Sequence, residues 1–159
     1  EPSHPHQLVQ HGLKKTDFVD GLSPTVKGFQ GIRDPALANG CACILATVSG
    51  DGEPDIGYKG SMMVFDKQSL AYLERTKRVH LKNLKENPKV IVLFRDAKTK
   101  VAWRFHGTAT LHESGPIWEQ GMARTVKEEL DKDPERKGII VQIQVDKITN
   151  MGGQVLQSR

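Results

Sequence analysis

The chain has 159 residues, of which 37% are hydrophobic and 26% are charged, and its formal net charge is +4. This length suits a single domain with a substantial core, and the composition is typical of a globular protein. No apolar run approaches the roughly 20 residues that a membrane-spanning helix requires. The modest positive charge favours an anionic ligand, but it falls short of the concentrated basic patch of a dedicated nucleic-acid-binding protein.

The sequence predicts one folded domain between two tails. Residues 1–23 contain no apolar segment of the kind that a signal peptide carries, and we predict that they form a flexible N-terminal tail. The domain is expected over residues 24–150, and its first part, 24–39, is a weakly helical lead-in interrupted by Gly and Pro. Residues 151–159 are predicted to be a C-terminal tail.

Six segments have the composition and periodicity of β-strands. In chain order they are CACILATVSG (41–50), DIGYKGSMMVFD (55–66), SLAYLE (69–74), KVIVLFRD (89–96), KVAWRFHGTATLH (100–112) and GIIVQIQVDKI (138–148). A hairpin-type turn, DGEP, joins the first two. Two short helices are expected, one after the third strand and one from Ser114 towards Asp131. Because several strands are apolar on both faces, we predict a mainly β fold, a six-stranded antiparallel barrel that is closed or nearly closed.

The first helix begins where cations gather. Arg75, Lys77 and Arg78 precede it in the stretch LERTKRVHLKNLKENPKV, which ends at a helix-stopping ENP. A helix N-terminus carries about half a positive charge, so cations there are unfavourable unless an anion is bound. A phosphate fits this position, since arginine offers a planar fork, Thr76 a hydroxyl group and the helix its free amides. The alternative is a solvated basic turn whose charge is partly offset by Glu74.

The second strand carries a further pair of polar side chains. Lys59 and Ser61 are two residues apart and share one face of the strand, and Gly57 and Gly60 flank them. Glycine permits close approach of the backbone to a ligand, although these glycines are also typical of a bulge at a barrel corner. If this strand lies beside the third one, Lys59, Ser61 and Arg75 can converge on one anion.

The two cysteines, Cys41 and Cys43, lie on one face of the first strand. That spacing does not suit a disulfide, and no second pair of Cys or His residues follows at metal-ligand spacing. We therefore expect no metal site and two core residues that stay reduced in the cytoplasm.

Three stretches together resemble the pyridoxamine 5'-phosphate oxidase-like family of FMN-binding split barrels. They are LATVSGDGEPDIGYKGSMMVFD, LAYLERTKRVHLKNLKENPKVIVLF and WRFHGTATL, and the resemblance covers roughly residues 41–149. It implies a split barrel and a homodimer that binds FMN between its subunits, with the phosphate at the second strand and at the helix start. The matching cofactor-binding positions are Lys59, Gly60, Ser61, Arg75, Thr76, Lys77, Arg78 and His80. His80 is equally well interpreted as a packed, neutral histidine.

The C-terminal sequence NMGGQVLQSR departs from the family's oxidases, which end on a strand with Arg and Pro that holds the vitamin B6 substrate. We therefore do not expect the vitamin B6 reaction. No catalytic acid or base stands out, because flavin chemistry resides in the cofactor. His106 and His112 are interpreted as polar-face residues, Trp103 as a core residue, and Trp118 is left open between core packing and packing on a flavin.

The favoured function is an FMN-dependent oxidoreductase that passes electrons or hydride between a nicotinamide donor and a small acceptor. One alternative is a noncatalytic FMN carrier or electron-transfer module. A second, from another class, is a barrel that binds single-stranded nucleic acid through exposed aromatic side chains. The deazaflavin F420 and haem are alternatives to FMN, because both are anionic.

Overall fold

The computed structural model describes residues 41–97 and 100–158, so the predicted N-terminal tail and helical lead-in lie outside the described residues. The strands are β1 (Cys41–Val48), β2 (Pro54–Tyr58), β3 (Met63–Val64), β4 (Ser69–Glu74), β5 (Lys89–Asp96), β6 (Ala102–His112), β7 (Ile139–Asn150) and β8 (Val155–Ser158). The helices are α4 (Val79–Glu86), α5 (Pro116–Arg124) and α6 (Lys127–Leu130). No helix among the described residues is long and apolar enough to cross a membrane.

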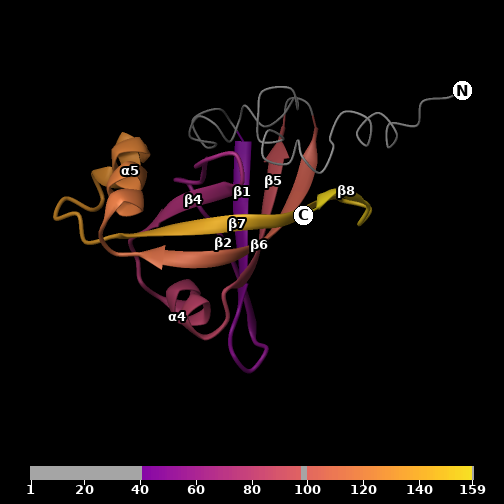
Figure 1. The fold of residues 1–159 in the computed structure, drawn as a ribbon, viewed down its shortest axis with the longest axis horizontal. Coiled ribbons are helices and arrows are strands. Elements are labelled where there is room, and N and C mark those ends of the chain that lie inside the picture. The colour runs from indigo at the N-terminus through magenta and orange to yellow at the C-terminus, as the bar shows by residue number, and fades with distance from the viewer. Residues whose placement is uncertain (1–40, 98–99, 159) are drawn as a thin grey trace, which may run out of the picture.

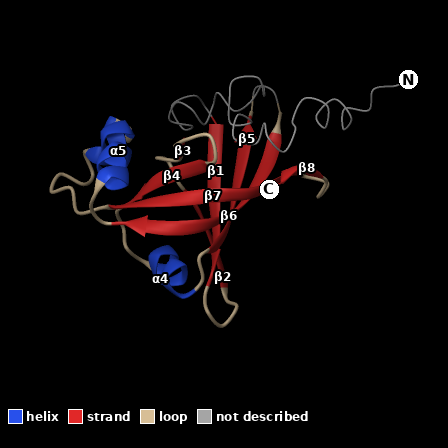
Figure 2. Ribbon diagram, in the orientation of Figure 1, coloured by secondary structure: helices blue, strands red, loops and turns tan. Residues whose placement is uncertain are grey.

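All the strands belong to one antiparallel sheet in the order β2-β1-β5-β6-β7-β4-β3, with β8 paired to β7. The sheet curls, so that β1 and β5 run across the direction of β6 and β7 (Figure 1). Helices α4 and α5 lie beside the same end of β6 and β7, one below and one above these strands in the view of Figure 2. The predicted mainly β split-barrel fold is confirmed, although the part of the chain that the structure describes holds eight strands instead of the six predicted.

The second predicted strand is two strands, because the chain turns at Gly60. The Lys59 N–H still donates to the Cys43 carbonyl oxygen of β1, over 3.0 Å. Beyond the turn, the Ser61 hydroxyl accepts the Leu73 N–H of β4 at 2.9 Å, and β3 pairs with β4. The segment therefore crosses from one part of the sheet to another, which supports the interpretation of its glycines as a barrel corner.

The predicted C-terminal tail contains a strand, β8, that the sequence analysis missed. The Asn150 N–H donates to the Gln154 carbonyl oxygen at 3.0 Å, which closes a tight turn after β7. Gly153 has a φ of 86° in this turn, and glycine adopts such left-handed values without strain. The chain therefore folds back, and β8 lies antiparallel to β7.

The inner face of the curled sheet carries the main core. Leu45, Val92, Phe105 and Ile148 occupy paired positions on β1, β5, β6 and β7, and each is at most 2% exposed. Burying side chains of this size contributes about 1.5–3 kcal/mol each. Cys43 lies in the same core, as predicted for it.

Trp103 is a core-packing residue, as predicted. Its ring lies 6.2 Å from that of Phe94 and packs against the inner core. Edge and offset contacts at this distance are favourable for aromatic pairs.

A second, smaller core lies between the outer face of β4 and β7 and helix α5. Its buried members are Met63, Phe65, Ala71, Leu73, Met122 and Ile140. Trp118 packs against this cluster and donates its indole N–H to the Gly138 carbonyl oxygen at 3.0 Å. Its role is therefore core packing.

The predicted helix from Ser114 to Asp131 is interrupted and forms α5 and α6. Thr125 ends α5, where its hydroxyl donates to the Gly121 carbonyl oxygen at 2.7 Å. Val126 is extended, with a φ of −61° and a ψ of 144°. This break turns α6 so that Glu129 faces the loop after β4.

Candidate functional site

Helix α4 begins at Val79 with an uncapped N-terminus. Arg78 is its N-cap residue, no side chain caps the free backbone N–H groups, and the first turn contains no acidic residue. Lys77 has a φ of 50°, a value that a non-glycine residue adopts at some cost in strain. Thr76, Lys77 and Arg78 are exposed, so cations and unpaired amides meet at one helix end.

Leu81 and Leu84 anchor this helix in the inner core, and they lie on the side that faces β1. The helix ends at Asn87, whose N–H donates to the Asn83 carbonyl oxygen at 2.7 Å, as the ENP sequence predicts. Lys82 and Lys85 are exposed, which agrees with their place on the solvated face. These contacts hold α4 against β1 and the inner core.

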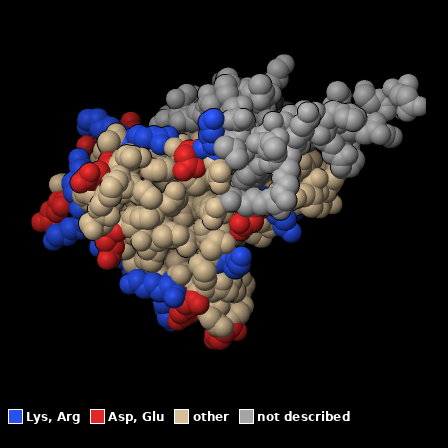
Figure 3. All heavy atoms as spheres, in the orientation of Figure 1, with Lys and Arg blue, Asp and Glu red and all other residues tan. Residues whose placement is uncertain are grey.

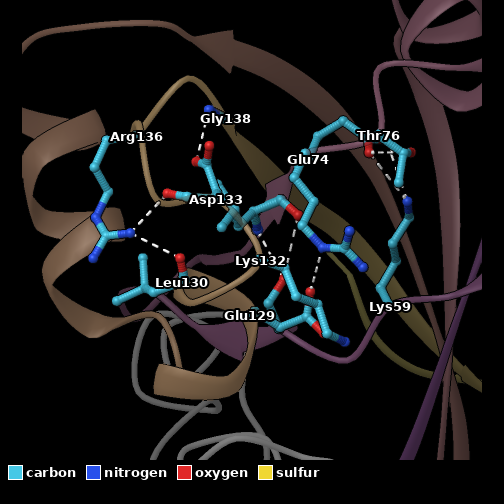
Figure 4. Close-up of polar contacts among 12 residues, drawn as sticks. Lys59, Glu74, Thr76, Glu129, Leu130, Lys132, Asp133, Arg136 and Gly138 are labelled. Carbon is cyan, nitrogen blue, oxygen red and sulfur yellow. Dashed lines mark hydrogen bonds and ion pairs between the residues drawn. The ribbon is translucent and has the colours of Figure 1, made fainter.

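Lys59 and Thr76 meet at the carboxylate of Glu74. The Lys59 ammonium group lies 3.2 Å from Oε1 of Glu74, and the Thr76 hydroxyl donates to its Oε2 over 3.2 Å. Figure 4 shows these three side chains pointing toward one another. The structure therefore brings Lys59 of the second-strand turn and Thr76 of the loop before α4 together around an acidic side chain.

Arg75 points to helix α6 instead of joining this group. Its Nε donates to Oε2 of Glu129 at 2.9 Å, while Lys132 lies 3.3 Å from the other oxygen of the same carboxylate. Burial on its own would raise the pKa of Glu129, but the hydrogen bonds and charges of Arg75 and Lys132 together outweigh burial and lower this pKa. Arg75 is thus already paired with an acid within the chain.

Gly60 and Ser61 shape the turn rather than present a side chain to the helix start. The Ser61 hydroxyl is buried, accepts the Leu73 N–H and lies 3.5 Å from the Leu73 carbonyl oxygen. Its hydrogen-bonding capacity is therefore used by the backbone of β4.

His80 packs between α4, β1 and β2. Its Nδ1 lies 2.8 Å from the Thr47 hydroxyl, which also accepts the Asn83 side-chain N–H at 3.0 Å. Burial, followed by the charge of Lys59, lowers the pKa of His80, so the neutral form prevails near pH 7. This geometry matches a packed, neutral histidine.

The sequence analysis named Glu74 only as a partial offset to the charge of a solvated basic turn, and it did not name Glu129 at all. Glu74 shares one strand face with Leu70 and Tyr72, because their spacing is two, and this periodicity indicates an inward-pointing carboxylate. Glu129 leaves no comparable signal, since it contacts Arg75 across 54 residues of sequence.

His106 and His112 match the prediction of polar-face residues. Nε2 of His106 lies 3.0 Å from the Thr149 hydroxyl, and Nε2 of His112 lies 3.1 Å from Oε1 of Gln142. Burial, then the charges of Lys147 and Arg104, lowers the pKa of His106. His106 also lines a cleft of about 670 Å³ whose wall includes Ala46, Val48 and Ile91.

The outer face of β2, β1 and β5 is apolar. Ile56 and Tyr58 of the edge strand β2 are 67% and 78% exposed. Ile56 is paired with Ala46, and Ala46 in turn with Ile91 of β5, so the apolar area continues across three strands. Figure 3 shows the side of the molecule on which β6 and β7 lie in front of β1, and there charged side chains lie around an area of uncharged residues. Exposed apolar areas of this kind are typical of interaction surfaces.

Within residues 41–97 and 100–158, no group of three or more His, Cys, Asp or Glu side chains is arranged to hold a metal ion.

The sequence profile of the pyridoxamine 5'-phosphate oxidase family matches residues 35–151. The chain belongs to this family. No curated protein matches the sequence. Among solved structures, a family member from Lactobacillus delbrueckii, described as a candidate pyridoxamine 5'-phosphate oxidase, is 32% identical, with 68% of this chain and 83% of that chain covered and a TM-score of 0.55. HupZ from Group A Streptococcus is 27% identical over 79% of this chain and 95% of its own, with a TM-score of 0.60.

More distant structures share the family's fold alone. An FMN-binding protein from Syntrophomonas wolfei is 17% identical over 86% of this chain and 88% of its own, with a TM-score of 0.58. The heme storage protein HutZ from Vibrio cholerae and an F420 reductase have the same fold at 20% and 17% identity. The fold therefore accommodates more than one anionic cofactor, and flavin binding is one of its uses.

Proposed function

We propose that the protein binds FMN as an oxidoreductase and that the start of α4 holds the FMN phosphate. The observation that carries this proposal is the uncapped helix end beside Lys77 and Arg78. Among the described residues these two cations have no acidic partner, whereas Lys59 is paired with Glu74 and Arg75 with Glu129. An arginine fork, a lysine and free helix amides form a donor set that suits a phosphate dianion.

When bound, FMN supplies the redox chemistry, accepting hydride or electrons from a nicotinamide donor and passing them to a small acceptor. The residues of this chain bind and orient the cofactor. In this proposal Arg78 and Lys77 attract the phosphate, and the Thr76 hydroxyl is the neutral donor beside them. Lys59, Gly60, Ser61, Arg75 and His80, which the family resemblance implied as ligands, act indirectly by holding the turn, the loop and the helix start.

The second part of the proposal is a homodimer with FMN at the subunit interface in the cytoplasm. A barrel of this size leaves the flavin ring exposed unless a second copy covers it. Support comes from the apolar outer face around Ile56 and Tyr58, which a two-fold related copy can bury.

A single-stranded nucleic-acid-binding barrel is less well supported. Such proteins stack bases on exposed aromatic side chains. In the part of the chain that the structure describes, Phe65, Tyr72, Phe94 and Phe105 are at most 8% exposed, and Tyr58 is the aromatic residue among the exposed large hydrophobic ones.

The decisive experiment is to identify the small molecule that the purified protein releases on denaturation, by mass and absorption spectrum. FMN supports the proposal, whereas F420 or haem would replace FMN as the cofactor. NAD(P)H oxidation by the FMN-loaded protein, followed at 340 nm, then separates an oxidoreductase from a noncatalytic FMN carrier.

A further inference from the structure

Glu74 is the most deeply buried acidic side chain near the helix start, at 1% exposure. Its two carboxylate oxygens accept hydrogen bonds from Lys59 at 3.2 and 3.5 Å and from Thr76 at 3.2 Å. Glu74 is also the last residue of β4, so it directly precedes the loop that leads to Lys77 and Arg78. The Glu74 carboxylate, bound to Lys59 and Thr76, therefore lies at the start of the loop that leads to the helix N-terminus.

The surroundings of Glu74 screen this charge poorly. Tyr72, two residues earlier on the same strand face, is fully buried, and the Lys59 ammonium group lies 5.1 Å from the centre of its ring. Burial, with the Glu74 charge as a second cause, raises the pKa of Tyr72, so the carboxylate acts on groups around it. Charges interact more strongly in such surroundings than in water.

We propose that Glu74 is a specificity-determining residue that sets how strongly the site prefers a phosphate dianion to an uncharged ligand. Glu74 neutralises Lys59 and engages the Thr76 hydroxyl, two donors that a phosphate at the helix start would otherwise attract. Both effects weaken phosphate binding and leave contacts with an uncharged flavin ring unchanged. This inference rests on the proposed flavin site, and its test separates the two.

The test is the isosteric variant Glu74→Gln, which retains an oxygen for Lys59 and Thr76 but removes the charge. Three ligands are titrated: FMN, riboflavin, which lacks the phosphate group, and inorganic phosphate. Binding of inorganic phosphate is measured as an increase in the melting temperature of the protein. We expect FMN affinity to rise about tenfold, riboflavin affinity to stay within about twofold, and stabilisation by inorganic phosphate to increase. Glu113→Gln is the matched control, since Glu113 is exposed and its change adds the same net charge.

Glu74→Gln leaves the partly buried Lys59 without a carboxylate partner, which destabilises the fold. A second pair of variants, Lys59→Gln and Lys59→Gln/Glu74→Gln, keeps the test valid if Glu74→Gln misfolds. Lys59→Gln leaves Glu74 uncompensated, so it should weaken FMN and phosphate binding about tenfold relative to wild type. The double variant Lys59→Gln/Glu74→Gln carries no net change in charge and should return FMN affinity to near the wild-type value. Comparing Lys59→Gln with the double variant measures the effect of the Glu74 charge in proteins that have no unpaired lysine at position 59.

The outcomes distinguish a failure of the proposed phosphate site from a failure of the role proposed for Glu74. If the wild type binds FMN and riboflavin equally, the phosphate site itself is wrong. If the wild type prefers FMN but Glu74→Gln leaves that preference and the phosphate response unchanged, and the double variant binds FMN no better than Lys59→Gln does, Glu74 is a structural partner of Lys59 and the inference is overturned. If no flavin binds, the response to inorganic phosphate still decides whether Glu74 tunes an anion site.

Discussion

At the scale of single residues, the cations before α4 differ in what they contact. Lys59 and Arg75 are bound to carboxylates of this chain, while Lys77 and Arg78 face solvent at the helix start. A cluster that is uniform in the sequence therefore contains two kinds of cation. Two of them pair with acids of the chain, and the other two have no acidic partner among the described residues.

Replacing Arg78 by Ala should weaken FMN binding about ten- to a hundredfold, because a charge-assisted contact to the phosphate is lost. Riboflavin binding should not change. In the absence of ligand, the variant should melt at the same temperature or slightly higher, since a cation opposes the positive end of the helix dipole. Fluorescence titration with both flavins and thermal melting measure these effects.

Lys85→Ala on the solvated face of α4 is the control for Arg78→Ala and should alter neither affinity. Arg75→Ala should weaken FMN less than Arg78→Ala does, because its Nε is already used by Glu129. An equal loss of FMN and riboflavin affinity in Arg78→Ala would contradict the phosphate contact.

His80 should make the protein less stable in mild acid. Its pKa is lowered in the folded state, so the unfolded chain, with a histidine pKa of about 6.5, takes up the proton first. The free energy of unfolding is therefore fully maintained above about pH 6.5 and falls as the pH drops towards the folded-state pKa. Urea unfolding at pH 7.5 and 5.5 measures the change.

The variant His80→Gln isolates this effect, because it keeps a hydrogen-bonding side chain against Thr47 but does not titrate. Its stability should fall less between pH 7.5 and 5.5 than that of the wild type. The remaining decrease includes His106, whose pKa is also lowered. An identical pH dependence in both proteins would show that His80 is not responsible.

At the scale of elements, helix α5 depends on a close approach to β7. A Cβ atom added at Gly121 would lie 2.7–2.9 Å from three side-chain carbons of Ile140, which is fully buried and has no room to move away. The glycine is thus a packing requirement between a helix and a strand.

Gly121→Ala should destabilise the protein by about 1–3 kcal/mol, because overpacking outweighs the roughly 1 kcal/mol that alanine gains in helix propensity. Gln120→Ala, next to it on the exposed side of α5, should be neutral within about 0.5 kcal/mol. Chemical denaturation of both variants tests the contact. A stabilised Gly121→Ala would mean that helix propensity dominates.

At the scale of the whole molecule, the outer face of β2, β1 and β5 is the feature that a single chain leaves unexplained. Ile56 and Tyr58 project from an edge strand and are largely exposed. An exposed apolar edge strand can pair with another molecule, and proteins usually cover such a strand or place charged side chains on it. A second copy of the chain would cover it here.

Ile56→Lys should convert the expected dimer to a monomer of 17.7 kDa in light scattering, because a lysine at the centre of an apolar interface is left without a partner. FMN retention should fall with it, if both subunits enclose the flavin. Met151→Lys is the matched control, since Met151 is also apolar and 48% exposed but lies in the β7–β8 turn. A wild-type protein that is monomeric with FMN bound would contradict the shared site.

The sequence by itself determined the local structure of this protein. The apolar run in SLAYLE and the alternation in WRFHGTATLH placed strands, ENP ended α4 at Asn87, and the order of motifs indicated the split barrel. These features depend on side-chain period and backbone preference, which act over a few neighbouring residues. The crowding of cations before the helix was visible for the same reason.

Only the tertiary structure decided which charges are paired. The partners Lys59–Glu74 and Arg75–Glu129 are separated by 15 and 54 residues, so they meet only when the sheet has curled and α6 has turned toward β4. The break at Gly60 and the added strand β8 likewise depend on which strand is available to pair. Contacts between distant segments are fixed by the closure of long loops and by the packing of both cores, and residue periodicity carries no information on either.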